Sequence, residues 1–324
     1  RQFNPNLREL PQVFDPRKSY RLSNKESIKT DGYSFNSGMN PAYGTPINYY
    51  LPDTLTERVF IEIRDEKNEI IRTLKGSNNP GINRIMWDLR YEPTYKPQLR
   101  TRPLGRPWVQ LNGEGWRPLV TWDLDLLSGQ YGPRVVPGKY KAVISIDKVS
   151  FEKDLMVLKD PTAKGSLEDV KKQVQFSLTL REAMNTAVTM INKIEYIRSE
   201  LLLLKTSLKK NSELKQVDRL MDIATQIAGS LYDIQLTGAR EDAFRSPMKL
   251  YGRLSALASE INSSGIDFKP TDQQGDVYEI LNQRLQKAKG AFNELTFNEI
   301  AAFNKNLNDM TMHIDMEKKM EKSN

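Results

Sequence analysis

Residues 81–90 read GINRIMWDLR, and this stretch indicates a strand at the centre of a β-domain. Pro80 and Gly81 supply turn residues directly before it. Alternation with a period of two then places Ile85, Trp87 and Leu89 on one face, with polar or flexible side chains on the other. We therefore expect Trp87 to anchor the core of an antiparallel sheet, as a structural residue and not as part of a site.

Similar strand patterns lie on both sides of this stretch. Alternating apolar residues occur at 47–51 and 59–63, a turn at 65–68 leads into 69–74, and a second Pro-Gly turn precedes 140–146. Residues 151–158 close the set. Six or seven short strands without helical segments between them predict an immunoglobulin or fibronectin-III-like antiparallel β-sandwich over residues 41–159.

After residue 160 the apolar period changes from 2 to 3.6, which predicts an α-helical bundle over residues 160–324. A long helix begins at Ser166 and is expected to break at Asn211-Ser212; a second helix runs to about residue 231, and a third covers 247–261. Thr271 and Gln274 have the spacing of a capping box that opens a fourth helix. The same spacing at 296–299 predicts the start of a separate last helix.

Composition limits the function classes. The 324 residues include no cysteine, which excludes disulfides, thiolate metal sites and cysteine nucleophiles. The net charge of +7 would favour acidic partners, but no nucleic-acid-binding motif is present and no apolar run has the length of a membrane span. Residues 1–40 show neither helical nor strand periodicity, so we expect an extended arm or linker there, and the first residues have the character of a processed or internal start.

An irregular insertion at residues 91–130 interrupts the strand pattern. Long loops of this kind are usually functional or cover a neighbouring element. Trp, Tyr and Arg are enriched in binding hot spots, which makes the insertion a candidate surface for a sugar or a protein. The alternative is that its aromatic side chains are buried filler in a seam between the two domains. The candidate residues are Tyr95, Arg100, Arg102, Arg106, Trp108, Trp116, Arg117 and Trp122.

No catalytic, cofactor or metal site is expected in this chain. His313 is the only histidine; Asp309 and Glu317 would share a helix face with it, but a hydrolytic zinc site takes three protein ligands and the His-Glu-x-x-His pattern is missing. The serine nucleophile elbow and the phosphate-binding loops are also missing. Asp123 and Asp125 beside Trp122 come nearest to a carboxylate pair, although such residues more often form a solvated strand edge.

Four segments of the chain resemble the C-terminal region of bacterial sortilin-like (VPS10-like, BNR-repeat) β-propeller proteins, which are abundant in Bacteroidota and are often labelled glycosyl hydrolases. The segments are NPAYGTPINYYL at 40–51, PGINRIMWDLR at 80–90, VPGKY at 136–140 and PTDQQ at 270–274. No Asp-box of the form Ser-x-Asp-x-Gly-x-x-Trp occurs in the chain, so we expect no propeller blade within it.

The resemblance implies that a β-propeller precedes residues 1–40, and that the parent protein is secreted or lies at the cell surface. Taken with the missing catalytic motifs, it predicts a non-catalytic interaction or scaffold module. The expected partners are the upstream propeller and an outer-membrane or cell-surface assembly. The alternative is an accessory, carbohydrate-binding region of a propeller-based glycoside hydrolase, with a glycan as partner and any catalytic site in the propeller.

Overall fold

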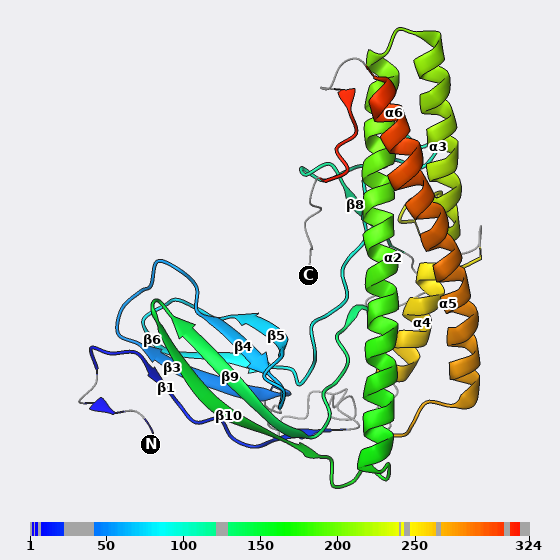
Figure 1. The fold of residues 1–324 in the computed structure, drawn as a ribbon. Helices are drawn as coiled ribbons and strands as arrows, with labels where there is room; N and C mark the ends of the chain where they lie inside the picture. The colour runs from blue at the N-terminus through cyan, green and yellow to red at the C-terminus, as the bar shows by residue number, and fades with distance from the viewer. Residues whose placement is uncertain are drawn as a thin grey trace. The chain divides into compact units, whose positions relative to one another are not determined.

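β-Strands precede α-helices along the chain, as the sequence predicts (Figure 1). The computed structural model describes residues 2, 4–5, 8–22, 42–120, 129–239, 241–242, 247–263, 267–307 and 312–317. The chain divides into two compact units. The first unit comprises Arg1–Pro93, Tyr131–Ser177 and Ser264–Pro270, and the second comprises Thr94–Gln130, Leu178–Ser263 and Thr271–Asn324.

Two β-sheets are formed by the described residues of the first unit. Three strands form one sheet in the order β1-β3-β6, with β1 at Gln12–Val13, β3 at Thr45–Leu51 and β6 at Gly81–Trp87. Five strands form the other in the order β2-β10-β9-β4-β5, with β2 at Ser19–Arg21, β4 at Phe60–Arg64, β5 at Ile70–Lys75, β9 at Gly138–Ile146 and β10 at Val149–Lys159. All pairs are antiparallel except β2 with β10, which is parallel.

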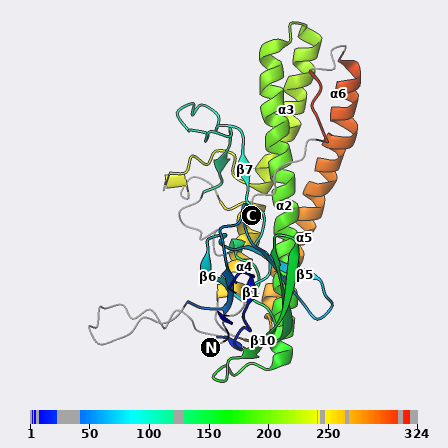
Figure 2. The same ribbon diagram turned by 90° about the vertical axis from the view of Figure 1, so that its left-hand side faces the viewer.

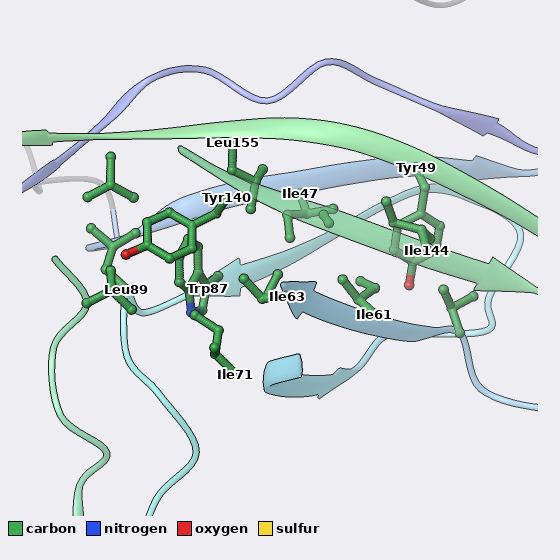
Figure 3. Packing of buried hydrophobic residues seen from close by; sticks show 14 of the residues in the cluster. Ile47, Tyr49, Ile61, Ile63, Ile71, Trp87, Leu89, Tyr140, Ile144 and Leu155 are labelled. Carbon is green, nitrogen blue, oxygen red and sulfur yellow. The ribbon is translucent and has the colours of Figure 1, made fainter. Parts of the chain in front are cut away.

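One apolar core receives side chains from both sheets (Figure 3). Trp87 is fully buried in this core, which confirms its predicted role as an anchor. Its ring meets that of Tyr140 edge-on, with the centroids 5.3 Å apart, and its Nε1 donates to the carbonyl oxygen of Arg90 at 3.0 Å. The indole N–H therefore keeps a partner after the ring is buried.

Part of the predicted N-terminal arm pairs with the sheets, which its lack of periodicity did not indicate. Gln12 and Val13 pair with Tyr50 and Tyr49 of β3, and residues 19–21 pair with 157–159 of β10. Strands of two or three residues are too short to show a period of two. They form because the edge strands β3 and β10 have backbone groups free to pair with them, and this long-range cause leaves no pattern in the local sequence.

The α-helices with defined bounds among the described residues are α2 at Leu167–Ser207, α3 at Asn211–Leu231, α4 at Leu250–Ser263, α5 at Asp272–Asn293 and α6 at Ile300–Asn306. Within the second unit, α5 packs against α3 and α4. The predicted start of α5 is confirmed, because the Thr271 hydroxyl accepts from the Gln274 N–H at 3.2 Å and the Gln274 side chain accepts from the Thr271 N–H at 2.9 Å. This capping box satisfies two N–H groups that the helix leaves without partners.

The predicted separate last helix is wrong. A π-helical segment, η4 at Glu294–Glu299, joins α5 directly to α6, and the Thr296 hydroxyl bonds back to the carbonyl oxygen of Phe292 at 2.9 Å instead of capping a helix. The reason lies in the apolar spacing. Leu295 and Ile300 are both fully buried although they stand five residues apart. In an α-helix that spacing would place the two side chains on different faces. The wider π turn brings both side chains to the core.

Candidate functional site

The segment 94–120, called the aromatic loop below, is attached to one face of α2 through its own backbone. Asn192 lies seven residues and Glu195 ten residues beyond Asn185, so the three side chains share that face. They accept the backbone N–H groups of Tyr95, Gln98 and Thr101, with Tyr95 donating to Asn185 at 2.9 Å, Gln98 to Asn192 at 2.8 Å and Thr101 to Glu195 at 2.8 Å. These three bonds therefore fix the position of residues 95–101 along α2.

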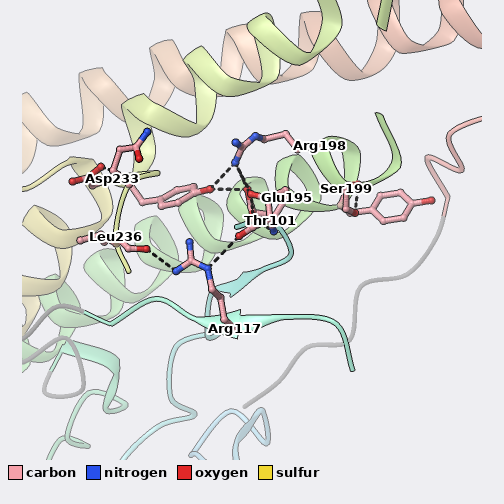
Figure 4. A network of polar contacts seen from close by, with 10 residues as sticks. Thr101, Arg117, Glu195, Arg198, Ser199, Asp233 and Leu236 are labelled. Carbon is pink, nitrogen blue, oxygen red and sulfur yellow. Dashed lines mark hydrogen bonds and ion pairs between the residues drawn. The ribbon is translucent and has the colours of Figure 1, made fainter. Parts of the chain in front are cut away.

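Glu195 is the centre of this attachment (Figure 4). Its side chain is fully buried, and it accepts from the Thr101 hydroxyl at 3.0 Å, from Arg198 Nη1 at 2.5 Å and from the Tyr232 hydroxyl at 2.7 Å. Burial raises the pKa of Tyr232 well above its ordinary value, and the neighbouring Glu195 carboxylate raises it further. A buried carboxylate with four charge-assisted or polar partners holds the loop firmly against α2.

Arg117 closes the base of the loop from its other end. Its Nε donates to the carbonyl oxygen of Thr101 at 3.1 Å and its Nη1 donates to that of Leu236 at 2.9 Å. Burial lowers the pKa of Arg117, while the carboxylate of Glu195 opposes that change. Two short strands, β7 at Gln98–Leu99 and β8 at Arg117–Pro118, pair beside this contact. Arg117 is thus buried in the base and is no part of an exposed binding surface.

The tip of the aromatic loop, residues 102–110, extends away from the helices of its unit (Figure 2). Leu104 is 86% exposed and Trp108 is 62% exposed. The guanidinium carbon of Arg106 lies 5.8 Å from the centre of the Trp108 ring, within the range of a cation–π contact. Arg102 is also exposed, and its Nε donates to the carbonyl oxygen of Val109 at 2.9 Å across the tip.

The predicted surface residues therefore fall into two groups. Arg102, Arg106 and Trp108 come together at the tip, where they are exposed or half-buried. The others lie lower on the loop or outside the described residues: Tyr95, Arg100 and Trp116 are half-buried, Arg117 is buried, and Trp122 falls in 121–128, outside the described residues. Trp116 donates from Nε1 to Glu114 Oε2 at 2.7 Å. The 62% exposure of Trp108 favours the binding alternative over buried filler.

Sequence reasoning missed Leu104 and Glu195. Leu104 stands between Pro103 and Gly105 in a segment without periodicity, so nothing in the pattern marks it as exposed. Glu195 carries a usable signal, because it lies four residues after the buried Ile191 and thus in phase with the apolar stripe of α2. A charged residue in such a position requires buried partners.

His313 is not on a helix, which corrects the expectation of a shared face with Asp309 and Glu317. Among the described residues α6 is the last α-helix and ends at Asn306, and His313 Nε2 lies 3.3 Å from the carbonyl oxygen of Leu307. Asp309, Asp123 and Asp125 lie outside the described residues. Across the part of the chain that the structure describes, no three His, Asp or Glu side chains come together as metal ligands would.

A second polar cluster lies inside the first unit. Arg21 is ion-paired with Asp267 and donates to Gln173 Oε1 at 2.8 Å, while Arg134 Nη2 lies 4.0 Å from the same Asp267 carboxylate. Burial lowers the pKa of Arg21 to about 10, and the neighbouring Arg134 contributes to this shift. Arg134 also donates to the carbonyl oxygen of Leu22 at 2.9 Å. The cluster joins β2, the start of α2 and residue 267, and we interpret it as a buried ion-pair network that stabilises the fold.

None of the helices within the described ranges has both the length and the apolar character needed to cross a membrane. Comparison of the chain with protein-family models, with curated proteins and with solved structures finds no match.

Proposed function

We propose that this chain is a non-catalytic interaction and scaffold module, in which the tip of the aromatic loop is the contact surface. The observation that carries the proposal is the contrast within one loop. Its base is buried and bonded to α2 through Glu195, whereas Trp108 and Leu104 at the tip remain in water at 62% and 86% exposure. Large apolar side chains on a firmly held loop are typical of binding surfaces, because little conformational entropy is lost when a partner covers them.

We further propose that the β-rich part is an immunoglobulin-like sandwich and that the helices form a bundle. The single core shared by the two sheets supports the first assignment, and the packing of α5 against α3 and α4 supports the second. On the resemblance to sortilin-like propeller proteins, the module would follow a β-propeller and act at the cell surface or outside the cell.

The second candidate is an accessory region that binds a carbohydrate. The exposed indole of Trp108 favours it, because an exposed aromatic ring can stack on the apolar face of a sugar. Its neighbour Arg106 would add a hydrogen-bond donor to the same surface. The two candidates share a site and differ only in the partner.

Sedimentation of the full chain with native cell-envelope material tests the proposal. We expect the wild type to sediment with the envelope and Trp108→Ala to remain in solution, while Leu203→Ala, which removes an equally exposed apolar side chain from α2, behaves like the wild type. Equal retention of all three proteins would contradict a contact through the tip. Retention of the wild type on purified polysaccharide, again lost with Trp108→Ala, would establish the carbohydrate candidate in place of the scaffold.

A further inference from the structure

We propose that the tip of the aromatic loop docks onto the surface of a lipid bilayer that carries anionic headgroups. The inference rests on the proposed function, because it names the partner of the same tip. Four observations carry it: the sign of the charge along the loop, the identity of the exposed apolar side chains, the projection of the tip from its unit, and the way in which the loop is held.

The loop is cationic over a long stretch. Residues 93–113 contain Lys96, Arg100, Arg102 and Arg106 and no aspartate or glutamate. Over most of the chain basic and acidic residues are interspersed, so a stretch of this length with one sign of charge is unusual for this protein. Lys96 and Arg102 are exposed and Arg106 is half-exposed. A cationic segment is attracted to a bilayer with a negative surface potential, and the attraction weakens as salt increases.

The exposed apolar residues are those that a bilayer interface accepts. Trp is enriched at the boundary between headgroups and acyl chains, where its ring is desolvated and its N–H still finds acceptors. Leu104, at 86% exposure, is the most exposed of the large apolar side chains within the described residues. Arg106 lies against the face of the Trp108 ring, so a positive charge accompanies the indole to the level of the phosphates.

The shape of the tip favours a bilayer over a protein groove. The segment between β7 and β8 projects from its unit (Figure 2), so Leu104 and Trp108 can enter a soft interface without a complementary cavity. A protein partner would need a pocket for each side chain and carboxylates for the arginines. An anionic bilayer supplies both environments over its whole surface.

The tip is also held in one conformation before docking. Arg106 N–H donates to the carbonyl oxygen of Pro103 at 3.1 Å, and Val109 N–H donates to that of Arg106 at 3.2 Å. Gly105, which lies inside the first of these turns, has φ +69°, a value that other residues adopt only with strain. Two successive turns and the Arg102 contact to Val109 therefore present Leu104 and Trp108 without a large ordering cost on binding.

Vesicle sedimentation of the full chain tests the inference. The vesicles are phosphatidylcholine alone or phosphatidylcholine mixed with phosphatidylglycerol. We expect binding only to the mixed vesicles, with an affinity that falls as salt rises. Trp108→Ala should weaken it by about tenfold through lost apolar burial. Arg106→Gln should weaken it and reduce its salt dependence. The matched controls, Leu203→Ala on α2 and the exposed Arg284→Gln on α5, should bind as the wild type does.

Absence of binding to the mixed vesicles, or binding that the tip variants leave unchanged, would overturn the inference. The envelope experiment then separates the two proposals. If envelope retention depends on Trp108 while lipid vesicles are not bound, the partner is a protein or a glycan, and only the bilayer inference fails. If neither assay depends on the tip, the proposed function fails with it.

Discussion

Glu195 accepts the backbone N–H of Thr101 at 2.8 Å from a fully buried position on α2. This bond joins an irregular loop to α2, a helix of 41 residues, and the charge of Glu195 is balanced by Arg198 at 2.5 Å. A buried carboxylate is costly unless its oxygen atoms have partners, and here the partners are Thr101 of the loop together with Arg198 and Tyr232. The fold of the loop and the stability of the helices are therefore expected to depend on each other.

Replacing Glu195 with alanine should destabilise the protein by about 3–5 kcal/mol, because the buried Thr101 N–H would lose its acceptor and the largely buried Arg198 would lose its ion pair. Urea unfolding followed by circular dichroism measures this. Glu182→Ala on the same helix is the control, since Glu182 is exposed and its pair with Arg181 should contribute little. Equal stability of the Glu195 variant and the control would contradict the anchoring role.

Removing the Trp87 side chain should cost about 3–5 kcal/mol through the cavity left in the core, in addition to the lost bond to Arg90. Trp108→Ala is the matched control, because it deletes the same side chain from a position that is 62% exposed. Thermal unfolding should show a large decrease in Tm for the first variant and almost none for the second. A core tolerant of Trp87→Ala would be inconsistent with a shared core between the sheets.

Asp267→Asn should destabilise the first unit by about 3–5 kcal/mol, because Arg21 and Arg134 would then be buried beside each other without a carboxylate. The control is Asp15→Asn, which breaks an ion pair with Lys153. The Asp15 side chain is 73% exposed, so this variant should cost less than about 1 kcal/mol. Denaturant unfolding compares the two. Similar losses in the free energy of unfolding for both variants would show that the buried ion-pair network contributes no more than a surface ion pair.

Tyr251 should make the protein less stable at alkaline pH. Burial raises its pKa from 10.0 to about 12, so the folded state holds the phenol proton that the unfolded state releases above pH 10. The stability present below pH 10 is therefore lost as the pH rises towards 12, by about 2–3 kcal/mol for this group. Urea unfolding at pH 8 and pH 11 should show a smaller pH effect for Tyr251→Phe than for the wild type. The exposed Tyr20→Phe should retain the wild-type effect.

The parts of the fold that the sequence predicted are those with a strong local pattern. The apolar alternation at residues 47–51 and the capping box at Thr271 depend only on nearby residues, and both appear as expected. The strands at 12–13 and 19–21 were missed because they form only when a sheet edge is available to pair with them. The π turn at Glu294–Glu299 was missed because the capping-box spacing at 296–299 competes with the wider apolar step between Leu295 and Ile300.

The sequence predicted which loop holds the candidate site, but not which residues of that loop are exposed. Composition marked Arg102, Arg106 and Trp108, but Arg117 has the same composition signal and lies in the buried base. What separates them is which backbone groups the α2 side chains bind, and that depends on contacts between residues about 94 positions apart, such as Thr101 and Glu195. Local sequence carries no record of such a contact beyond a charge in phase with an apolar stripe.

The most direct test of whether the tip binds rather than folds uses the double variant Leu104→Ala/Trp108→Ala. Its free energy of unfolding and its retention by native envelope material are measured on the same preparation. We predict a free energy of unfolding within about 0.5 kcal/mol of the wild type, because both side chains are exposed, together with loss of retention. A clear loss of stability with unchanged retention would contradict this prediction and assign the tip to the fold.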